Sequence, residues 1–420
     1  MKGHRVCLAL LISIQAVLGF DGHREGLANS HIFNAIYSAL RKWDSSVNAG
    51  GNGMSAFLAN IPKGTLLYHG NPGPEIVNGT EFLALDPEFS LVFARKRRGP
   101  APAGMTDQDD GGDGLAGWLH TYNTIKDLNL LYIDGHSASK GQDGTLDFGD
   151  RIVLNDTTSG GVEAEYQRAQ TFCKFASDQW RGRVDGLMRL GGDFEVILCS
   201  FEEGLEFVRR VRTNATVGGH RRGQGPPGSG ISRSGGIGVR SATANFDYFV
   251  SAYAYGLDLA SSGTHHVPRL IHIASQKLDP VRYDIERLIL GQKPSAATHD
   301  WQRVVDQTVA RYADKVAFLA RSGDKPVEAS REVAQRLLTP FVDWEKRDDE
   351  AEVERCAKEY LPTTATGDSP AYDAVYGVTR RICSTLAEAV KRKDQTAEMF
   401  ADHFQRLVRY LNWPVWRQPE

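Results

Sequence analysis

The polar residues that follow the N-terminal apolar run have the types that proton transfer requires. His23 and Glu25 can donate or accept a proton near neutral pH, so both are candidate catalytic residues. Asp21, Gly22 and Gly26 are candidates for substrate binding, since glycine lets the backbone approach a ligand closely. This composition predicts a loop over residues 20–27. A solvated N-terminal loop with no chemical role is the alternative.

A histidine and a glycine follow the strand-like run 65–68. His69 is a third candidate proton carrier, and the amide of Gly70 is a candidate donor to a substrate oxygen. A histidine-glycine pair at a strand end is also common turn chemistry.

Asp134 follows the continuous apolar run 130–133 and precedes a glycine. A buried strand that ends in aspartate places a carboxylate at the edge of the sheet, where the sites of α/β folds gather. We therefore consider Asp134, with Tyr132 beside it, a candidate for binding a guanidinium group. A helix cap or an ordinary turn is the alternative.

Glu195 lies within a strand-like run whose apolar residues alternate. Phe194, Val196 and Leu198 share one face, and Glu195 shares the other face with Ile197. A carboxylate among apolar neighbours must be paired or must titrate near neutrality. Glu195 is thus a candidate catalytic residue, with a structural ion pair as the alternative.

The pattern of apolar residues predicts an α+β fold. Short strand-like runs and helices mix in the first half, whereas helical periods dominate from Asp300 onward. We expect residues 1–19 to form a signal-like apolar segment, 20–217 a mixed α/β catalytic lobe, 218–244 a flexible loop rich in Gly, Pro, Ser and Arg, and 245–420 a mainly helical lobe. A one-sided apolar stripe predicts a helix after Asp300, formed by Trp301, Val304, Val305, Val309, Tyr312, Val316 and Leu319.

The overall composition is that of a globular protein with a full hydrophobic core. The 420 residues are 41% hydrophobic and 24% charged, with a formal net charge of −3, so a nucleic-acid site would have to be a local basic patch. Local basic clusters of this kind occur at 95–98, 209–212 and 220–222, although such runs are commonly solvated faces.

Residues 1–19 have the layout of a secretory signal, and no segment is a confident membrane span. The cysteines lack the spacing of a metal or redox motif, so no metal or cofactor site is predicted. Cys199 is expected to be a small core residue. Cys356 and Cys383 could form a bridge in an oxidising lumen, but their spacing does not establish it.

Five segments together resemble a fungal family of arginine-containing cyclodipeptide synthases. Its opening motif has asparagine at the position of Arg24. The segments are 20–36, 64–70, 130–135, 144–147 and 194–199.

The resemblance implies an enzyme that joins arginine and a second amino acid, both taken from aminoacyl-tRNAs, into a cyclo(Arg-Xaa) diketopiperazine for secondary metabolism. That reaction needs a base for the attacking amine and donors for the oxyanion. Under this interpretation His23, Glu25, His69 and Glu195 are the candidate catalytic residues. No cofactor is implied.

A secretory signal conflicts with the use of cytosolic aminoacyl-tRNA. Either residues 1–19 are retained on a membrane surface, or the tRNA-dependent interpretation is wrong. The alternative is a secreted ADP-ribosyltransferase-like enzyme or effector that uses NAD, in which His69 and Glu195 would complete one nicotinamide pocket. A secreted binding protein without activity is a third possibility, favoured if those two residues lie far apart.

Overall fold

A computed structural model describes most of the chain. The described residues are 22–42, 53–95, 116–139, 145–158, 164–213, 237–238, 241–259, 267–294, 297–365, 367 and 369–416. The signal-like segment 1–19 lies outside them, as does almost all of the loop predicted at 218–244.

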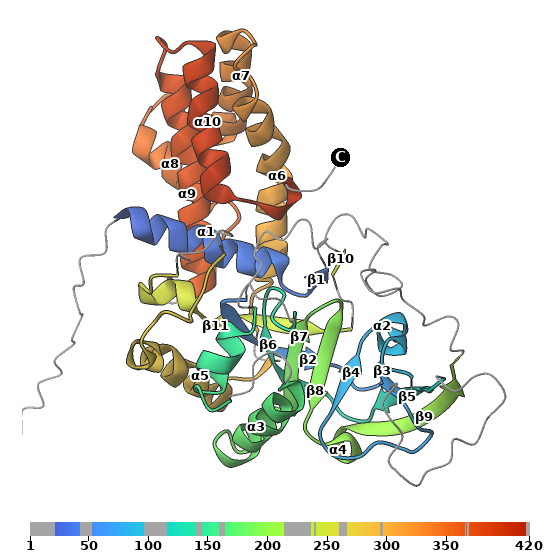
Figure 1. Ribbon diagram of the computed structural model, residues 1–420. Helices are drawn as coiled ribbons and strands as arrows, with labels where there is room; N and C mark the ends of the chain where they lie inside the picture. Colours follow the sequence, from blue (N-terminus) through green and yellow to red (C-terminus); the bar gives the residue numbers. More distant parts are fainter. Residues whose placement is uncertain are drawn as a thin grey trace, which may run out of the picture.

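The fold is α+β, as predicted, and its centre is a curled nine-stranded sheet (Figure 1). All neighbouring strands are antiparallel except β6 and β7, which run parallel. A parallel pair requires a crossover, which the π-helix η2 (Gly149–Val153) and α3 (Glu165–Asp178) provide. In spatial order the strands are β11 (Thr243–Ser251), β2 (Ser55–Ile61), β6 (Leu128–Ile133), β7 (Gly186–Leu190), β8 (Phe194–Leu198), β4 (Glu81–Ala84), β3 (Leu66–Asn71), β5 (Trp118–Thr124) and β9 (Leu205–Arg212).

The predicted lobe boundary does not separate strands from helices. β11 begins near the end of the predicted flexible loop, yet it pairs with β2 and forms one edge of the sheet. Two further short strands, β1 (Arg41–Lys42) and β10 (Ile237–Gly238), pair with each other apart from the sheet.

Both faces of the central strands are buried. Leu130 and Tyr132 of β6 belong to the core beneath the N-terminal and C-terminal helices, whereas Leu131 and Ile133 belong to the core beneath α3 and α5 (Asp279–Gly291). In β8 the side chains alternate between the two faces of the sheet as predicted, and Ile197 packs on the face that α3 covers. Covered faces on both sides explain the continuous apolar run in β6.

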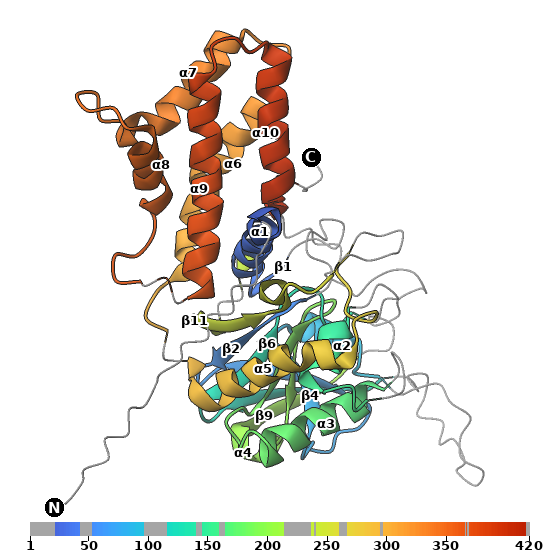
Figure 2. The same cartoon turned by 90° about the vertical axis from the view of Figure 1, so that its left-hand side faces the viewer.

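The C-terminal helices pack together above the sheet in both views (Figures 1 and 2). α6 begins at Trp301, and all seven residues of its predicted stripe are buried. Short helices complete the described part of the chain: α2 (Pro87–Leu91), α4 (Phe201–Gly204), η4 (Ala252–Tyr255), η5 (Ser275–Leu278), η7 (Thr339–Phe341) and η8 (Pro414–Trp416). The long C-terminal helices are α6 (Trp301–Ala320), α7 (Val327–Leu338), α8 (Asp349–Lys358), α9 (Pro370–Lys391) and α10 (Ala397–Leu411).

α1 (Gly22–Ser38) lies between the C-terminal helices and the sheet (Figure 1). Ser30 Oγ and Asn34 Nδ2 donate hydrogen bonds to the carbonyl oxygens of Tyr410 and Leu411, over 2.5 and 2.8 Å. The last carbonyls of a helix have no partner within it, so α1 satisfies the end of α10. The N-terminal helix therefore holds the C-terminal helices in place.

Two disulfide bonds pair the four cysteines in the described part of the chain. Cys356 of α8 is bonded to Cys383 of α9, a pairing that the sequence allowed. Cys199 is bonded to Cys173 of α3, so the prediction of an unbonded core cysteine is wrong. The pairing depends on α3 lying across the end of β8, which local sequence does not reveal.

Candidate active site

Asp134 lies directly after the last residue of β6, at the end of this inner strand, and only 8% of its surface is exposed. Its Oδ1 accepts hydrogen bonds from the amides of Met54, at 2.9 Å, and Ser55, at 2.8 Å. Burial raises the pKa of Asp134 to about 7, although these amide bonds act in the opposite direction. A carboxyl group with such a pKa can exchange a proton near neutral pH.

The chain approaches Asp134 so closely that only glycine fits beside it. A Cβ atom on Gly53 would lie 1.9 Å from the carbonyl oxygen of Asp134. Gly53 therefore lets the start of β2 reach the carboxylate.

Two tyrosines lie near Asp134, and a histidine stacks on one of them. The hydroxyl of Tyr132 accepts a hydrogen bond from the amide of Leu40 at 3.2 Å, so it is used within the fold. Burial, followed by the negative charge of Asp134, raises the pKa of Tyr253. The ring of His31, in α1, stacks on Tyr253 with ring centroids 4.2 Å apart. From the sequence, Tyr253 is one of four aromatic residues that could stack on nucleic-acid bases but are more often core, and His31 has no predicted role.

Glu195 is a paired carboxylate on the α3 side of the sheet. Nη2 of Arg189 donates to Glu195 Oε1 at 2.5 Å and to Glu165 Oε2 at 2.7 Å. Arg189 is 4% exposed, and its two partners neutralise a charge that would otherwise be costly to bury. Of the alternatives for Glu195, the structure therefore shows the ion pair.

His69 lies on the opposite face of the sheet from Glu195. Tyr68 pairs with Ala84, which pairs in turn with Glu195, so these three side chains share one face and His69 points to the other. Nδ1 of His69 lies 2.7 Å from the carbonyl oxygen of Phe82. The structure does not bring His69 and Glu195 into one pocket.

Gly70 is a site of close packing. A Cβ atom there would lie 2.1 Å from the carbonyl oxygen of Ser90 in α2. The glycine is required because a helix backbone crosses β3 at this point.

The loop predicted for residues 20–27 is wrong from Gly22 onward, because α1 begins there. α1 runs to Ser38, so the helix includes the two glycines, Gly22 and Gly26, which weaken a helix without preventing it. Inside a helix the amide of Gly26 bonds to a carbonyl four residues earlier, so it is not available to an oxyanion. Asp21 and the side chains of His23 and Glu25 lie outside the described residues, and their roles stay predictions.

Asp247 is a second buried aspartate, which the sequence analysis missed. It lies at a bulge in β11, is 5% exposed, and accepts five hydrogen bonds from the residues that begin α6. Burial alone would raise the pKa of Asp247, but these bonds outweigh it and hold the pKa below its usual range. The donors are Thr298 N and Oγ1, His299 N and Nδ1, and Trp301 Nε1.

The part of the chain that the structure describes contains no cluster of three or more His, Cys, Asp or Glu side chains suited to a metal ion. Within the same residues no helix is long and apolar enough to span a membrane.

Comparisons with known proteins give relatives without an assigned function. Residues 25–114 and 103–218 match the family described as the YPL277C N-terminal domain. The uncharacterized protein YOR389W of Saccharomyces cerevisiae is 31% identical over 224 residues, and the uncharacterized protein YPL277C is 32% identical over 223 residues. These alignments cover 44% of this chain but only 34% and 44% of the respective relatives. No solved structure matches. The chain is thus similar, over residues that include eight of the nine strands of the sheet, to a family named for an uncharacterized yeast protein.

Proposed function

We propose that this protein is an arginine-containing cyclodipeptide synthase, which takes arginine and a second amino acid from aminoacyl-tRNAs and closes them into a diketopiperazine. The resemblance of the five segments named above supports the proposal. Four of these segments contribute buried side chains to the same hydrophobic core, including Phe33, Leu67, Tyr132 and Phe194. The resemblance therefore concerns residues that are packed together.

The observation that carries the proposal is the buried carboxyl group of Asp134. An aminoacyl ester attacks only through a neutral α-amine, and α-amino groups have a pKa of roughly 7.7–8.0. A base with a pKa of about 7 is closely matched to that group and can take its proton at neutral pH. We therefore propose that Asp134 acts as the general base. The sequence predicts a different role for it, the binding of a guanidinium group.

The chemistry then needs two aminolysis steps. In the first, the amine of one aminoacyl group attacks the ester carbonyl of the other, Asp134 accepts the proton, and one tRNA leaves with its 3′ hydroxyl restored. In the second, the free amine of the dipeptidyl ester attacks its own ester carbonyl, the ester bond breaks, and the amine proton passes to the leaving 3′ oxygen, which releases the ring and the second tRNA. The second step is intramolecular, so positioning contributes most of its acceleration.

The β9 edge of the sheet is the proposed contact for tRNA phosphates. Arg209 and Arg212 are exposed on this strand, which pairs only with β5 among the described strands. Within the described residues neither side chain has an ion-pair partner. Free guanidinium groups along an edge strand suit a phosphate backbone.

The alternative, a secreted ADP-ribosyltransferase-like enzyme, is favoured by one observation. The four described cysteines form two disulfide bonds, which persist in oxidising compartments. However, the nicotinamide pocket expected from His69 and Glu195 is not formed, because these residues face opposite sides of the sheet.

Expression of the full chain in yeast tests the proposal directly. We expect mass spectrometry of cell extracts to reveal a new cyclo(Arg-Xaa), and its mass names the second amino acid. Accumulation of the folded protein without such a product contradicts the proposal. Alkylation of free thiols before lysis separates the two candidates further, since the luminal alternative requires all four cysteines to be protected. NAD cleavage by the purified protein would support that alternative.

A further inference from the structure

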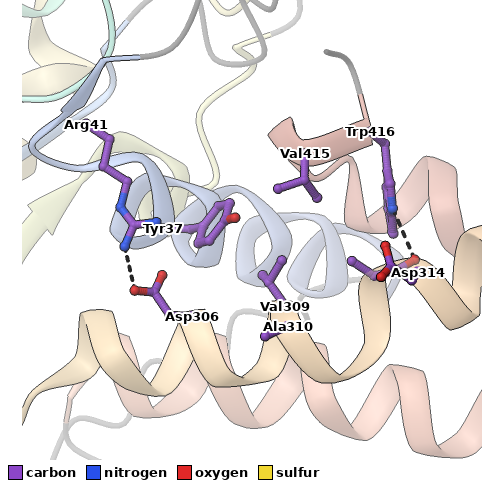
Figure 3. Close-up of a pocket in the computed structure, with 9 residues that line it drawn as sticks. Tyr37, Arg41, Asp306, Val309, Ala310, Asp314, Val415 and Trp416 are labelled. Carbon is purple, nitrogen blue, oxygen red and sulfur yellow. Dashed lines mark hydrogen bonds and ion pairs between the residues drawn. The ribbon is translucent and has the colours of Figure 1, made fainter. Parts of the chain in front are cut away.

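A pocket of about 350 Å³ opens between α1, α6 and η8, away from Asp134 (Figure 3). We call it the α1–α6 pocket. Its floor is formed by small or short side chains of α6, and its ends carry aromatic and charged groups. The lining residues are Tyr37, Arg41, Asp306, Val309, Ala310, Ala313, Asp314, Val415 and Trp416.

One end of the pocket already holds a guanidinium group of the chain itself. Nη2 of Arg41 lies 2.5 Å from Asp306 Oδ2, and the guanidinium carbon lies 5.1 Å from the centre of the Tyr37 ring. A carboxylate beside an aromatic face is the combination that suits this cation.

The other end repeats the same two groups, and no cation of the described residues lines it. Trp416 and Asp314 lie together there (Figure 3), and Trp416 Nε1 donates to the carbonyl oxygen of Ala313 at 3.2 Å, which fixes the indole ring. Asp314 is exposed, and among the described residues no cation pairs with it. The short side chains of Ala310 and Ala313 leave room between the two ends.

The charges of the pocket do not balance. The lining contains the carboxylates of Asp306 and Asp314 but, among the described residues, only the guanidinium group of Arg41, and Asp306 Oδ1 is buried without a hydrogen-bond partner in the described structure. Burial raises the pKa of Asp306, although Arg41 acts against this shift. A second cation in the pocket would therefore relieve an uncompensated negative charge.

We propose that the α1–α6 pocket binds a guanidinium group, stacked on Trp416 and hydrogen-bonded to Asp314. The ligand would repeat at this end what Arg41 does at the other. A planar guanidinium can stack and form paired bonds, whereas an ammonium group cannot do both. The pocket volume is within the range of small-ligand sites. The inference is independent of the proposed function and of Asp134.

Calorimetric titration of the full chain tests this inference. We expect L-arginine and agmatine to bind, L-lysine to bind about tenfold more weakly, and L-citrulline, which has the shape of arginine without its charge, not to bind. Equal binding of citrulline and arginine, or no binding of either guanidinium compound, overturns the inference. A blocked arginine-containing peptide distinguishes the source: tighter binding of the peptide indicates a protein segment, and tighter binding of free arginine indicates a small molecule.

Variants locate the binding in the pocket. Asp314→Asn and Trp416→Leu should each weaken arginine binding about tenfold, whereas Asp324→Asn, an exposed change beyond the end of α6, should not alter it. Wild-type affinity in Asp314→Asn contradicts the inference. Trp416→Phe keeps an aromatic ring and provides the comparison if Trp416→Leu does not fold. Asp134→Asn should bind arginine in the α1–α6 pocket with wild-type affinity. Loss of cyclo(Arg-Xaa) formation in that variant therefore tests the proposed function and not this inference.

Discussion

Two buried aspartates in different regions of the molecule have opposite properties. Asp134, at the edge of the sheet, accepts two amide hydrogen bonds and has its pKa raised to about 7. Asp247, where β11 meets the start of α6, is even less exposed, but five donors surround it and its pKa is lowered. Both side chains are nearly inaccessible to solvent, but Asp134 lies deeper in the protein, so burial outweighs its amide bonds there, whereas the five bonds outweigh burial at Asp247.

The difference separates a structural role from a chemical one. Five donors hold Asp247 ionised, so it joins the sheet to the helices as a fixed charge. Two donors leave Asp134 able to gain and lose a proton while it still holds the start of β2. A site for proton transfer is therefore expected at the less satisfied carboxyl group.

The largest expected effect is on product formation by Asp134→Asn. Asparagine keeps an oxygen for the amides of Met54 and Ser55 but cannot accept the proton of the amine, so we expect activity to fall by roughly 10²–10⁴-fold. The measurement is the yield of cyclo(Arg-Xaa) per folded protein. Ser137→Ala is the matched control, because Ser137 is also buried at this strand end and bonds only to the carbonyl oxygen of Ile133. Activity retained in Asp134→Asn removes the general base from the mechanism.

The next largest effect is on stability, through Asp247→Ala. The substitution leaves buried donors without an acceptor, Trp301 Nε1 among them, and should lower the free energy of unfolding by about 3–5 kcal/mol. Urea unfolding measures the change. Asp324→Ala, at an exposed position, should change stability by less than about 0.5 kcal/mol. A loss below about 1 kcal/mol for Asp247→Ala would show that the five bonds do not join the two regions.

Much of the fold could be predicted from sequence because it is encoded locally. The α+β class, the buried faces of β6 and β8, and the apolar stripe of α6 all follow from residue periodicity. The position of Asp134 at a strand end follows from the same signal.

The remaining features depend on residues that are distant in the chain. Arg189 meets Glu165 only because α3 packs on β7, and Asp247 meets Trp301 across a separation of 54 residues. The helix from Gly22 was mistaken for a loop because glycine and charged residues mask its period. No local pattern contains this information.

Removal of a single donor to Asp247 tests whether each hydrogen bond contributes separately. Thr298→Val keeps the shape of the side chain and the hydrogen bond from the Thr298 amide. It removes the hydroxyl group that donates to Asp247 Oδ2, 2.9 Å away. We expect a loss of about 1 kcal/mol in urea unfolding, since four donors remain. Thr171→Val, at a partly exposed position on α3 where the hydroxyl group donates to the carbonyl oxygen of Gln167, is the control. A loss as large as that of Asp247→Ala would mean that the donors do not contribute separately.

The two aspartates should also differ in how their contributions to stability depend on pH. The pKa of Asp134 is raised in the folded state, so its contribution is present at low pH and is lost as pH rises through about 7. The contribution of Asp247 has the opposite sign and is lost as pH falls from the ordinary aspartate value through its lowered pKa. Between pH ~5 and ~7, unfolding of the wild type should therefore show a falling component, at most about 1.4 kcal/mol per pH unit, that is missing in Asp134→Asn. A constant difference between the two proteins over this range contradicts the assignment.

The most direct test is the titration of Asp134 itself. Carbon-13 NMR of protein labelled at aspartate carboxyl groups, with Asp134→Asn to assign the signal, measures its pKa in the full chain. We predict a midpoint of about 7, well separated from that of Asp247. A midpoint at or below the ordinary aspartate value of about 3.9 would show that Asp134 is a fixed charge and not the proton carrier.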